Sequence, residues 1–217
     1  MNIKPILFST EMVQAILEGR KTQTRRIIKP QPKEGIITTA FDFKKGFYAS
    51  KIKIEENPDR FEITKLFKPK YQTGDILWVR ESFAKPPIYA FGVKYIYKAG
   101  FNESICGWKP SIHMPKEAAR IFLEVTNVRV ERLKDISEED AIAEGIDKKG
   151  DLYFNYFESK LLGKGLPKEY FYKEISKVSF MSLWSKINGI DSWKANPWVW
   201  VYEFKVVEKP KDFTHEH

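Results

Sequence analysis

The feature that most restricts the fold is a stretch near the end of the chain in which large side chains alternate residue by residue. Four aromatic residues occupy every second position of this stretch: Trp198, Trp200, Tyr202 and Phe204. Successive side chains of a β-strand point to opposite faces, so a strand over 197–206 would carry one entirely aromatic face. An apolar face of this size favours burial, and we interpret it as part of a core rather than as a platform for stacking bases.

A second stretch, 120–131, carries the clearest strand pattern, but its apolar residues change parity halfway. The alternating aliphatic residues are odd-numbered up to Val125 and even-numbered from Val128 onward. A bulge or sharp bend near Thr126 and Asn127 would return both groups to one face of the sheet. Bends of this kind let a short sheet curl.

Two further stretches, Ile6 to Phe8 and Ile76 to Glu81, indicate strands of the same sheet. Helices are predicted where a capping serine precedes apolar residues at helical spacing and a glycine follows. Three segments fit this pattern: 9–18, 137–144 and 176–188. We therefore predict an α+β fold in which helices flank a curled, mainly antiparallel sheet.

The chain's 217 residues are enough for one sizeable core, so we predict a single domain over 1–217. Insertions are expected at 31–70 and at 146–172, and the second could form a lid. Cys106 is the only cysteine and there are three histidines, too few for a His/Cys metal cage, so we expect no metal and no other cofactor. No apolar stretch is long enough to span a bilayer, so a cytoplasmic protein without a membrane partner is expected.

The densest group of cations and hydroxyls lies between the first predicted helix and the next extended segment. Gly19 would end the helix in a left-handed conformation, which leaves Arg20, Lys21 and Thr24 on a short loop that can approach a ligand. A net charge of +8 favours polyanionic ligands such as RNA, DNA or a phosphorylated small molecule. A merely solvated basic loop is the alternative interpretation.

Four residues of this group, Gly19, Lys21, Thr24 and Arg26, reproduce the pattern G-x-K-x-x-T-x-R. In this the chain resembles the ASCH-domain family, which is related to the PUA RNA-binding domains. The resemblance continues in order through four further segments: 73–81, 123–128, 136–145 and 198–200. It implies a PUA-like sheet or barrel. In the order and spacing of these segments, the whole chain resembles the larger ASCH proteins of bacteria and bacteriophages, whereas the small, minimal members match only its core.

The resemblance also implies a chemistry. The nearest characterised activity in the family is that of small proteins resembling an amidohydrolase that removes the acetyl group of N4-acetylcytidine. There a lysine is the base, a threonine the nucleophile and a glutamate the proton donor. These roles carry over to Lys21, Thr24 and Glu144. Substrate contacts are expected from five further residues: Gly19, Arg20, Arg25, Arg26 and Glu81. If Glu144 points away from Lys21, Glu81 is the replacement acid.

Lys21 can act as a base only when neutral, so its pKa must be lowered. The neighbouring arginines would lower the pKa of Lys21 by like-charge repulsion, whereas the nearby helix end would raise it, and the sequence leaves the balance open. Two other functions also stay open, partly because the minimal enzymes lack both insertions. One is a non-catalytic module that binds RNA or another nucleic acid through phosphate contacts and base stacking. The other is a ribonuclease, since a lysine, a glutamate and arginines also suit phosphodiester cleavage.

Overall fold

The fold is described from a computed structural model. It covers residues 2–32, 36–42, 47–54, 57–86, 92–101, 107–146, 148–149, 152–153 and 175–213. Most of the second predicted insertion, including the segment interpreted as a lid, lies outside the described residues.

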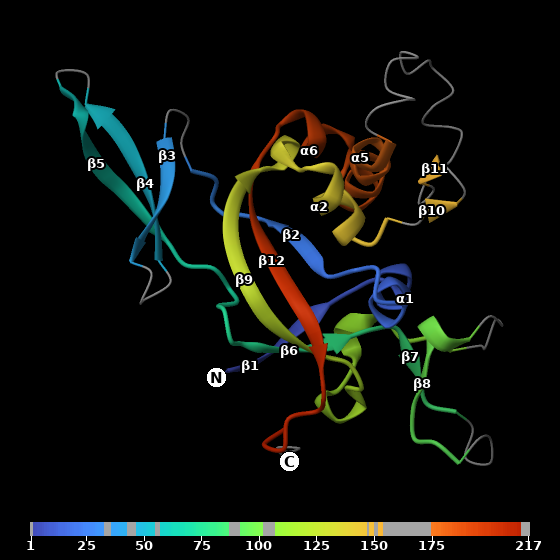
Figure 1. The fold of residues 1–217 in the computed structure, drawn as a ribbon. Coiled ribbons are helices and arrows are strands. Elements are labelled where there is room, and N and C mark those ends of the chain that lie inside the picture. Colours follow the sequence, from blue (N-terminus) through green and yellow to red (C-terminus); the bar gives the residue numbers. More distant parts are fainter. Residues whose placement is uncertain are drawn as a thin grey trace.

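A five-stranded sheet forms the centre of the molecule (Figure 1). Its strands follow the order β1 (Ile3–Leu7), β6 (Ile76–Arg80), β9 (Phe122–Arg132), β12 (Trp198–Val207) and β2 (Gln23–Ile27). β1 runs parallel to β6, and every other neighbouring pair is antiparallel. The predicted α+β class and the mainly antiparallel sheet are therefore confirmed. The sheet is open, with β1 and β2 as its two edges, so a closed barrel is not observed.

The predicted irregularity in β9 is confirmed by its pairing with β12. Glu203 lies opposite Asn127, whereas the next residue, Phe204, lies opposite Val125. Thr126 is therefore the additional residue of a bulge, which restores the alternation on both sides and bends the strand. Figure 1 shows β9 and β12 curving together across the molecule.

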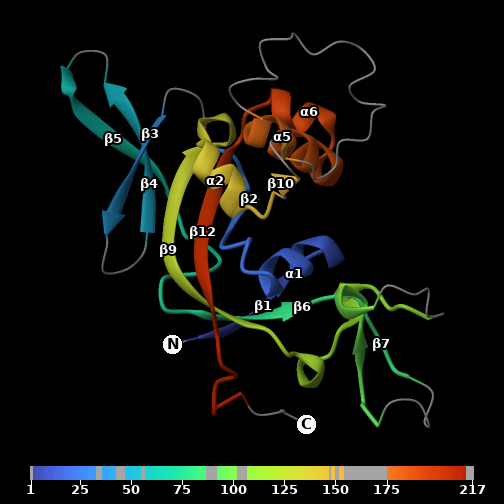
Figure 2. The ribbon, with the colours of Figure 1, turned by 45° about the vertical axis from the view of Figure 1, so that its right-hand side comes forward.

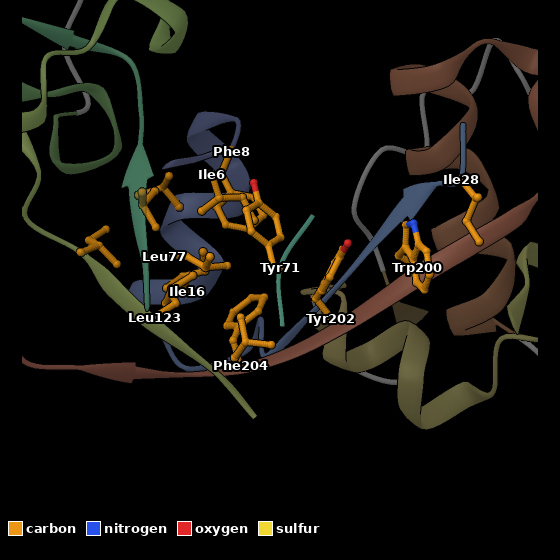
Figure 3. Close-up of a cluster of buried hydrophobic side chains, with 14 of the residues drawn as sticks. Ile6, Phe8, Ile16, Ile28, Tyr71, Leu77, Leu123, Trp200, Tyr202 and Phe204 are labelled. Carbon is orange, nitrogen blue, oxygen red and sulfur yellow. The ribbon is translucent and has the colours of Figure 1, made fainter. Parts of the chain in front are cut away.

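The aromatic face of β12 lies in the main core, as predicted. Trp200, Tyr202 and Phe204 project to the same side of the strand (Figure 3), and each is less than one-tenth exposed. They pack against side chains from β1, α1 and β6. Val199 and Val201, on the opposite face, pack in a separate cluster with α2 and α5. Because each fully buried large side chain contributes about 1.5–3 kcal/mol, β12 is a main source of stability for both faces.

The helices begin at the predicted caps, with one exception. Helix α1 (Thr10–Leu17) is capped by Ser9, and α2 (Glu138–Ala143) by Ser137. Helix α5 (Ile175–Asn188) already includes Ser176, which was predicted to precede it. A short helix, α6 (Ile190–Lys194), follows. Figure 2 shows α2, α5 and α6 gathered at one end of the sheet, with α1 below them.

The first predicted insertion contains a second sheet. Three antiparallel strands form it: β3 (Ile36–Asp42), β4 (Phe47–Ile54) and β5 (Asn57–Phe67). This sheet stands off from the central one (Figures 1 and 2). Two small pairs complete the described strands, β7 (Phe83–Ala84) with β8 (Ile96–Tyr97) and β10 (Lys148–Lys149) with β11 (Leu152–Tyr153). Among the described helices, none combines the length and the apolar character needed to cross a membrane.

Candidate functional site

The end of α1 turns the chain back on itself. Gly19 adopts φ +73°, and the backbone N–H groups of Arg20 and Lys21 both donate to the carbonyl of Ala15. Lys21 then pairs with Glu144 as an isolated antiparallel bridge, so the loop is joined to the end of α2. Thr24 lies in strand β2 rather than on the predicted loop, because the backbone is already extended from Gln23 onward.

The side chains of Lys21 and Glu144 form a buried ion pair. Lys21 Nζ lies 2.8 Å from Glu144 Oε2, and also donates to the backbone carbonyls of Gln23 and Glu144, both at 2.8 Å. An ammonium group has three N–H donors, so all three are used. Lys21 is only 2% exposed and Arg25 only 5%. The alternative of a solvated basic loop is therefore wrong for these two residues.

A glycine allows this close approach. Gly145 adopts φ +94°, and a Cβ atom at this position would lie 3.0 Å from the Cβ atoms of both Ala15 and Lys21. Any other residue would be strained by the backbone conformation and would also push α1 and the Lys21 loop away from α2. Gly145 thus both ends α2 and brings Glu144 to Lys21.

Arg25 holds the other carboxylate oxygen of Glu144. Its Nη1 atom lies 3.2 Å from Glu144 Oε1 and 2.6 Å from Gln23 Oε1, while Nη2 lies 2.7 Å from Asp140 Oδ2. Glu131 accepts a further bond from Arg25 Nη2 at 3.1 Å. Buried charges require this degree of pairing, since an uncompensated one costs several kcal/mol. Glu144 is therefore fixed from two sides by cations.

The sequence analysis missed the outer part of this network. Arg129, on β9, donates to Glu131, Asp140 and Glu203. Because Arg25 of β2 binds the first two of these carboxylates as well, the network links β2, β9, β12 and α2. One signal was present in the sequence. Charged residues alternate within the second half of β9, at positions where a strand covered on both faces would carry apolar ones.

The pKa of Lys21 is lowered from its ordinary value, and burial is the main cause. The negative charge and hydrogen bond of Glu144 oppose this effect, and the charges of Arg26 and Arg25 add to it. Repulsion by these two arginines was expected from the sequence, whereas the effect of burial was not. Together these effects leave Lys21 more easily deprotonated than an ordinary lysine.

A cavity of about 220 Å³ lies beside this pair. Its polar walls include Thr24, Arg25, Arg26 and Glu144, and α5 supplies an apolar wall. That wall consists of Phe180, Leu183, Trp184 and Ile187. Lys21 does not line the cavity, but its Nζ atom is bonded to Glu144, which does. We refer to this space as the first cavity. The contribution of α5 was not predicted, because its apolar residues were interpreted only as a helix face.

The remaining predicted site residues are divided between this region and another. Arg20 donates to Glu18 and to the carbonyl of Gly145, next to the ion pair. Arg26 donates to the carbonyl of Leu7 at 2.8 Å and lines the first cavity. Glu81 does not line it. Its carboxylate accepts two hydrogen bonds from Arg120, at 2.8 and 3.0 Å. Glu144 does point to Lys21, so the condition under which Glu81 was to replace it is not met.

The comparisons with known proteins give no relative from which to transfer a function. No protein-family model matches the chain, and neither the curated proteins nor the solved structures include a match. A function must therefore be argued from the site itself.

Proposed function

We propose that the protein is an amidohydrolase that removes the acyl group from an N4-acylated cytosine, as the ASCH resemblance implies. One observation carries the proposal. Glu144 is bonded to a buried lysine at 2.8 Å and lines the same cavity as Thr24. A base, a hydroxyl and an acid are the groups that an acyl transfer through a covalent intermediate requires.

The proposed reaction begins with a proton transfer from Lys21 to Glu144, which leaves a neutral amine and a carboxylic acid. The amine accepts the hydroxyl proton of Thr24 as its oxygen attacks the acyl carbon. The carbon–N4 bond then breaks, N4 takes the proton held by Glu144, and the free cytosine leaves. Water hydrolyses the acyl ester of Thr24, with Glu144 taking one proton of the water and Thr24 recovering its own. Glu144 then returns the proton that it took from water to Lys21, which is again an ammonium group, and the acyl group leaves as a carboxylic acid, so protons and charges balance.

The electrostatics of the cavity support this chemistry. Arg25 and Arg26 place positive charge on the walls, which favours the oxyanion that forms when the acyl carbon becomes tetrahedral. The volume of about 220 Å³ is below the range of about 300–1,000 Å³ typical of ligand pockets. This size favours a single modified base over a larger group. On the same ASCH resemblance, we also propose that the open central sheet is a variant of the PUA-like fold.

The burial of Lys21 argues against the two alternatives. A lysine whose three donors are used within the protein has none left for a phosphate, so it cannot serve as the phosphate contact that RNA binding or phosphodiester cleavage would assign to it. The amidohydrolase reaction uses Lys21 only for proton transfer, and the bond of 2.8 Å between Lys21 Nζ and Glu144 Oε2 provides the path for the first transfer.

The experiment that tests the proposal is an incubation of the protein with N4-acetylcytidine and, separately, with a mixed RNA pool. Mass spectrometry follows the acetyl group, and gel electrophoresis follows the length of the RNA. We expect loss of the acetyl group and intact RNA. Shortened RNA would favour a ribonuclease, and an unchanged acetyl group in both substrates would contradict the proposal.

A further inference from the structure

A second cavity, of about 380 Å³, lies at the seam between the two edge strands of the open sheet. Ile6 and Leu7 of β1 line one side of it, and Arg26 and Ile27 of β2 line the other. The guanidinium of Arg26 crosses the seam to the carbonyl of Leu7 at 2.8 Å. In a closed barrel, β1 and β2 would pair with each other along this seam. Here they are the two edges of an open sheet, and side chains of both strands line the cavity between them.

The charge of the second cavity has one sign. Four cationic side chains line it, and its lining includes no aspartate or glutamate: the cations are Arg26, Lys29, Lys68 and Lys70. All four residues are exposed, so a ligand can reach them from solvent. A concave surface with this charge attracts anions, and several adjacent phosphates fit it better than a single carboxylate.

Aromatic rings line the same cavity. Tyr71, Trp200 and Tyr202 take part, and Figure 3 shows the last two projecting from β12 on the same side as Tyr71. Tyr71 is held in place by two contacts. Its hydroxyl donates to the carbonyl of Pro5 at 2.8 Å, and its ring packs edge-on against the ring of Tyr202, with 5.1 Å between the two ring centroids. Because the three rings are less than one-tenth exposed, they form the rigid inner wall of the cavity, and the exposed cations are the groups that a ligand meets.

The two cavities are adjacent. Three residues, Arg26, Ile27 and Lys29, line both of them. A ligand that placed one base in the first cavity would therefore bring its neighbouring phosphate against Arg26 and Lys29, and its neighbouring nucleotide into the second cavity.

We infer that the second cavity binds the neighbouring nucleotide of a single-stranded nucleic acid, so that the substrate is a polynucleotide rather than a free nucleoside. The exposed cations hold its phosphates. This inference rests on the proposed function for the identity of the base in the first cavity. Phosphate and base chemistry alone do not separate RNA from DNA, so the test includes both.

The test measures binding by fluorescence anisotropy with labelled single-stranded RNA and DNA of about ten nucleotides. The informative variant is Lys68→Gln/Lys70→Gln. The control is Lys94→Gln/Lys194→Gln, which removes the same charge from exposed lysines outside both cavities. Each lost phosphate contact lowers the slope of log affinity against log salt by about 0.7. We expect the informative variant to bind more weakly with a slope smaller by about 1.4, and the control to keep the slope of the unmodified protein.

Two results would overturn the inference. One is that the informative variant and the control variant bind the oligonucleotides with equal affinity, and the other is that the protein binds cytidine monophosphate as tightly as it binds the oligonucleotides. Hydrolysis of N4-acetylcytidine is measured in parallel. If the nucleoside is hydrolysed but substitution of Lys68 and Lys70 does not change the affinity for oligonucleotides, the inference fails and the proposed function stands. If binding depends on these lysines but no acetyl group is removed from nucleoside or oligonucleotide, the proposed function fails and the second cavity remains a nucleic-acid site.

Discussion

Lys21 Nζ lies 2.8 Å from Glu144 Oε2, although 123 positions separate the two residues in the chain. Their backbones also meet, as an isolated bridge between the loop after α1 and the end of α2. The ion pair is therefore part of the connection between two helices. Because the same carboxylate lines the first cavity, a change in this pair should alter both the stability of the fold and the chemistry of the site.

Lys21→Met and Glu144→Gln should each destabilise the protein, because each leaves the other group buried with one partner fewer. Breaking a buried pair typically costs about 3–5 kcal/mol. The double variant removes both charges, so it should lose less than the sum of the single losses, with a coupling of about 0.5–3 kcal/mol. Urea unfolding at neutral pH measures the four free energies of unfolding. Additive losses would show that the two side chains do not interact.

Gly145→Ala should be more destabilising than Gly189→Ala. Both glycines have positive φ values, +94° and +88°, which residues with a side chain rarely adopt, so both substitutions carry a backbone cost of about 1–3 kcal/mol. Only at Gly145 would the new methyl group also meet neighbours, at 3.0 Å from Ala15 and Lys21, whereas Gly189 has open space. Overpacking adds about 1–3 kcal/mol. Thermal and urea unfolding of the two variants measure the difference, and equal losses would argue against the close contact.

Asp140→Asn should change how stability depends on pH. Burial alone would raise the pKa of Asp140, but the hydrogen bond from Gln23 and the charges of Arg25 and Arg129 outweigh it and hold the pKa below 3.8. The unfolded chain then takes up this proton at a higher pH than the folded one, so the stabilisation is complete well above pH 3.8 and is lost as the pH falls through the folded pKa.

The variant lacks this contribution at every pH. The difference in free energy of unfolding between the unmodified protein and Asp140→Asn should therefore be largest near neutral pH and should shrink as the pH falls below about 4. Urea unfolding at a series of pH values measures it. Parallel curves for the two proteins would mean that Asp140 is not held by the arginines.

The strands and caps of the central fold could be predicted because their signals are local. In the strand predicted over Ile76 to Glu81, alternation puts Leu77 and Val79 on the opposite face from Ile76 and Trp78, and the structure has the two pairs in different clusters. The change of parity in β9 predicted a bulge near Thr126 and Asn127, and the structure has it at Thr126. In both cases the period of a strand relates sequence to face without knowledge of the partner strand.

The environment of the site could not be predicted in the same way. Lys21 and Arg25 belong to residue types that are usually exposed, and their burial follows from contacts with α2 and β9, more than a hundred positions away. The motif includes Lys21, and Arg25 was expected to contact the substrate, but neither prediction included Gln23, Glu131 or Asp140, which hold these two side chains. The open edge between β1 and β2 likewise depends on strand order, which alternation does not reveal.

The central claim is that Thr24 attacks the acyl group. The most direct test compares the rate of N4-acetylcytidine hydrolysis by the unmodified protein, Thr24→Val and Thr24→Ser. Valine keeps the shape of threonine without the hydroxyl, and serine keeps the hydroxyl. We predict that Thr24→Val loses at least about 10²-fold in rate with an unchanged unfolding temperature, and that Thr24→Ser retains most of the activity. Hydrolysis by Thr24→Val at the rate of the unmodified protein, or no hydrolysis by the unmodified protein itself, would contradict the account.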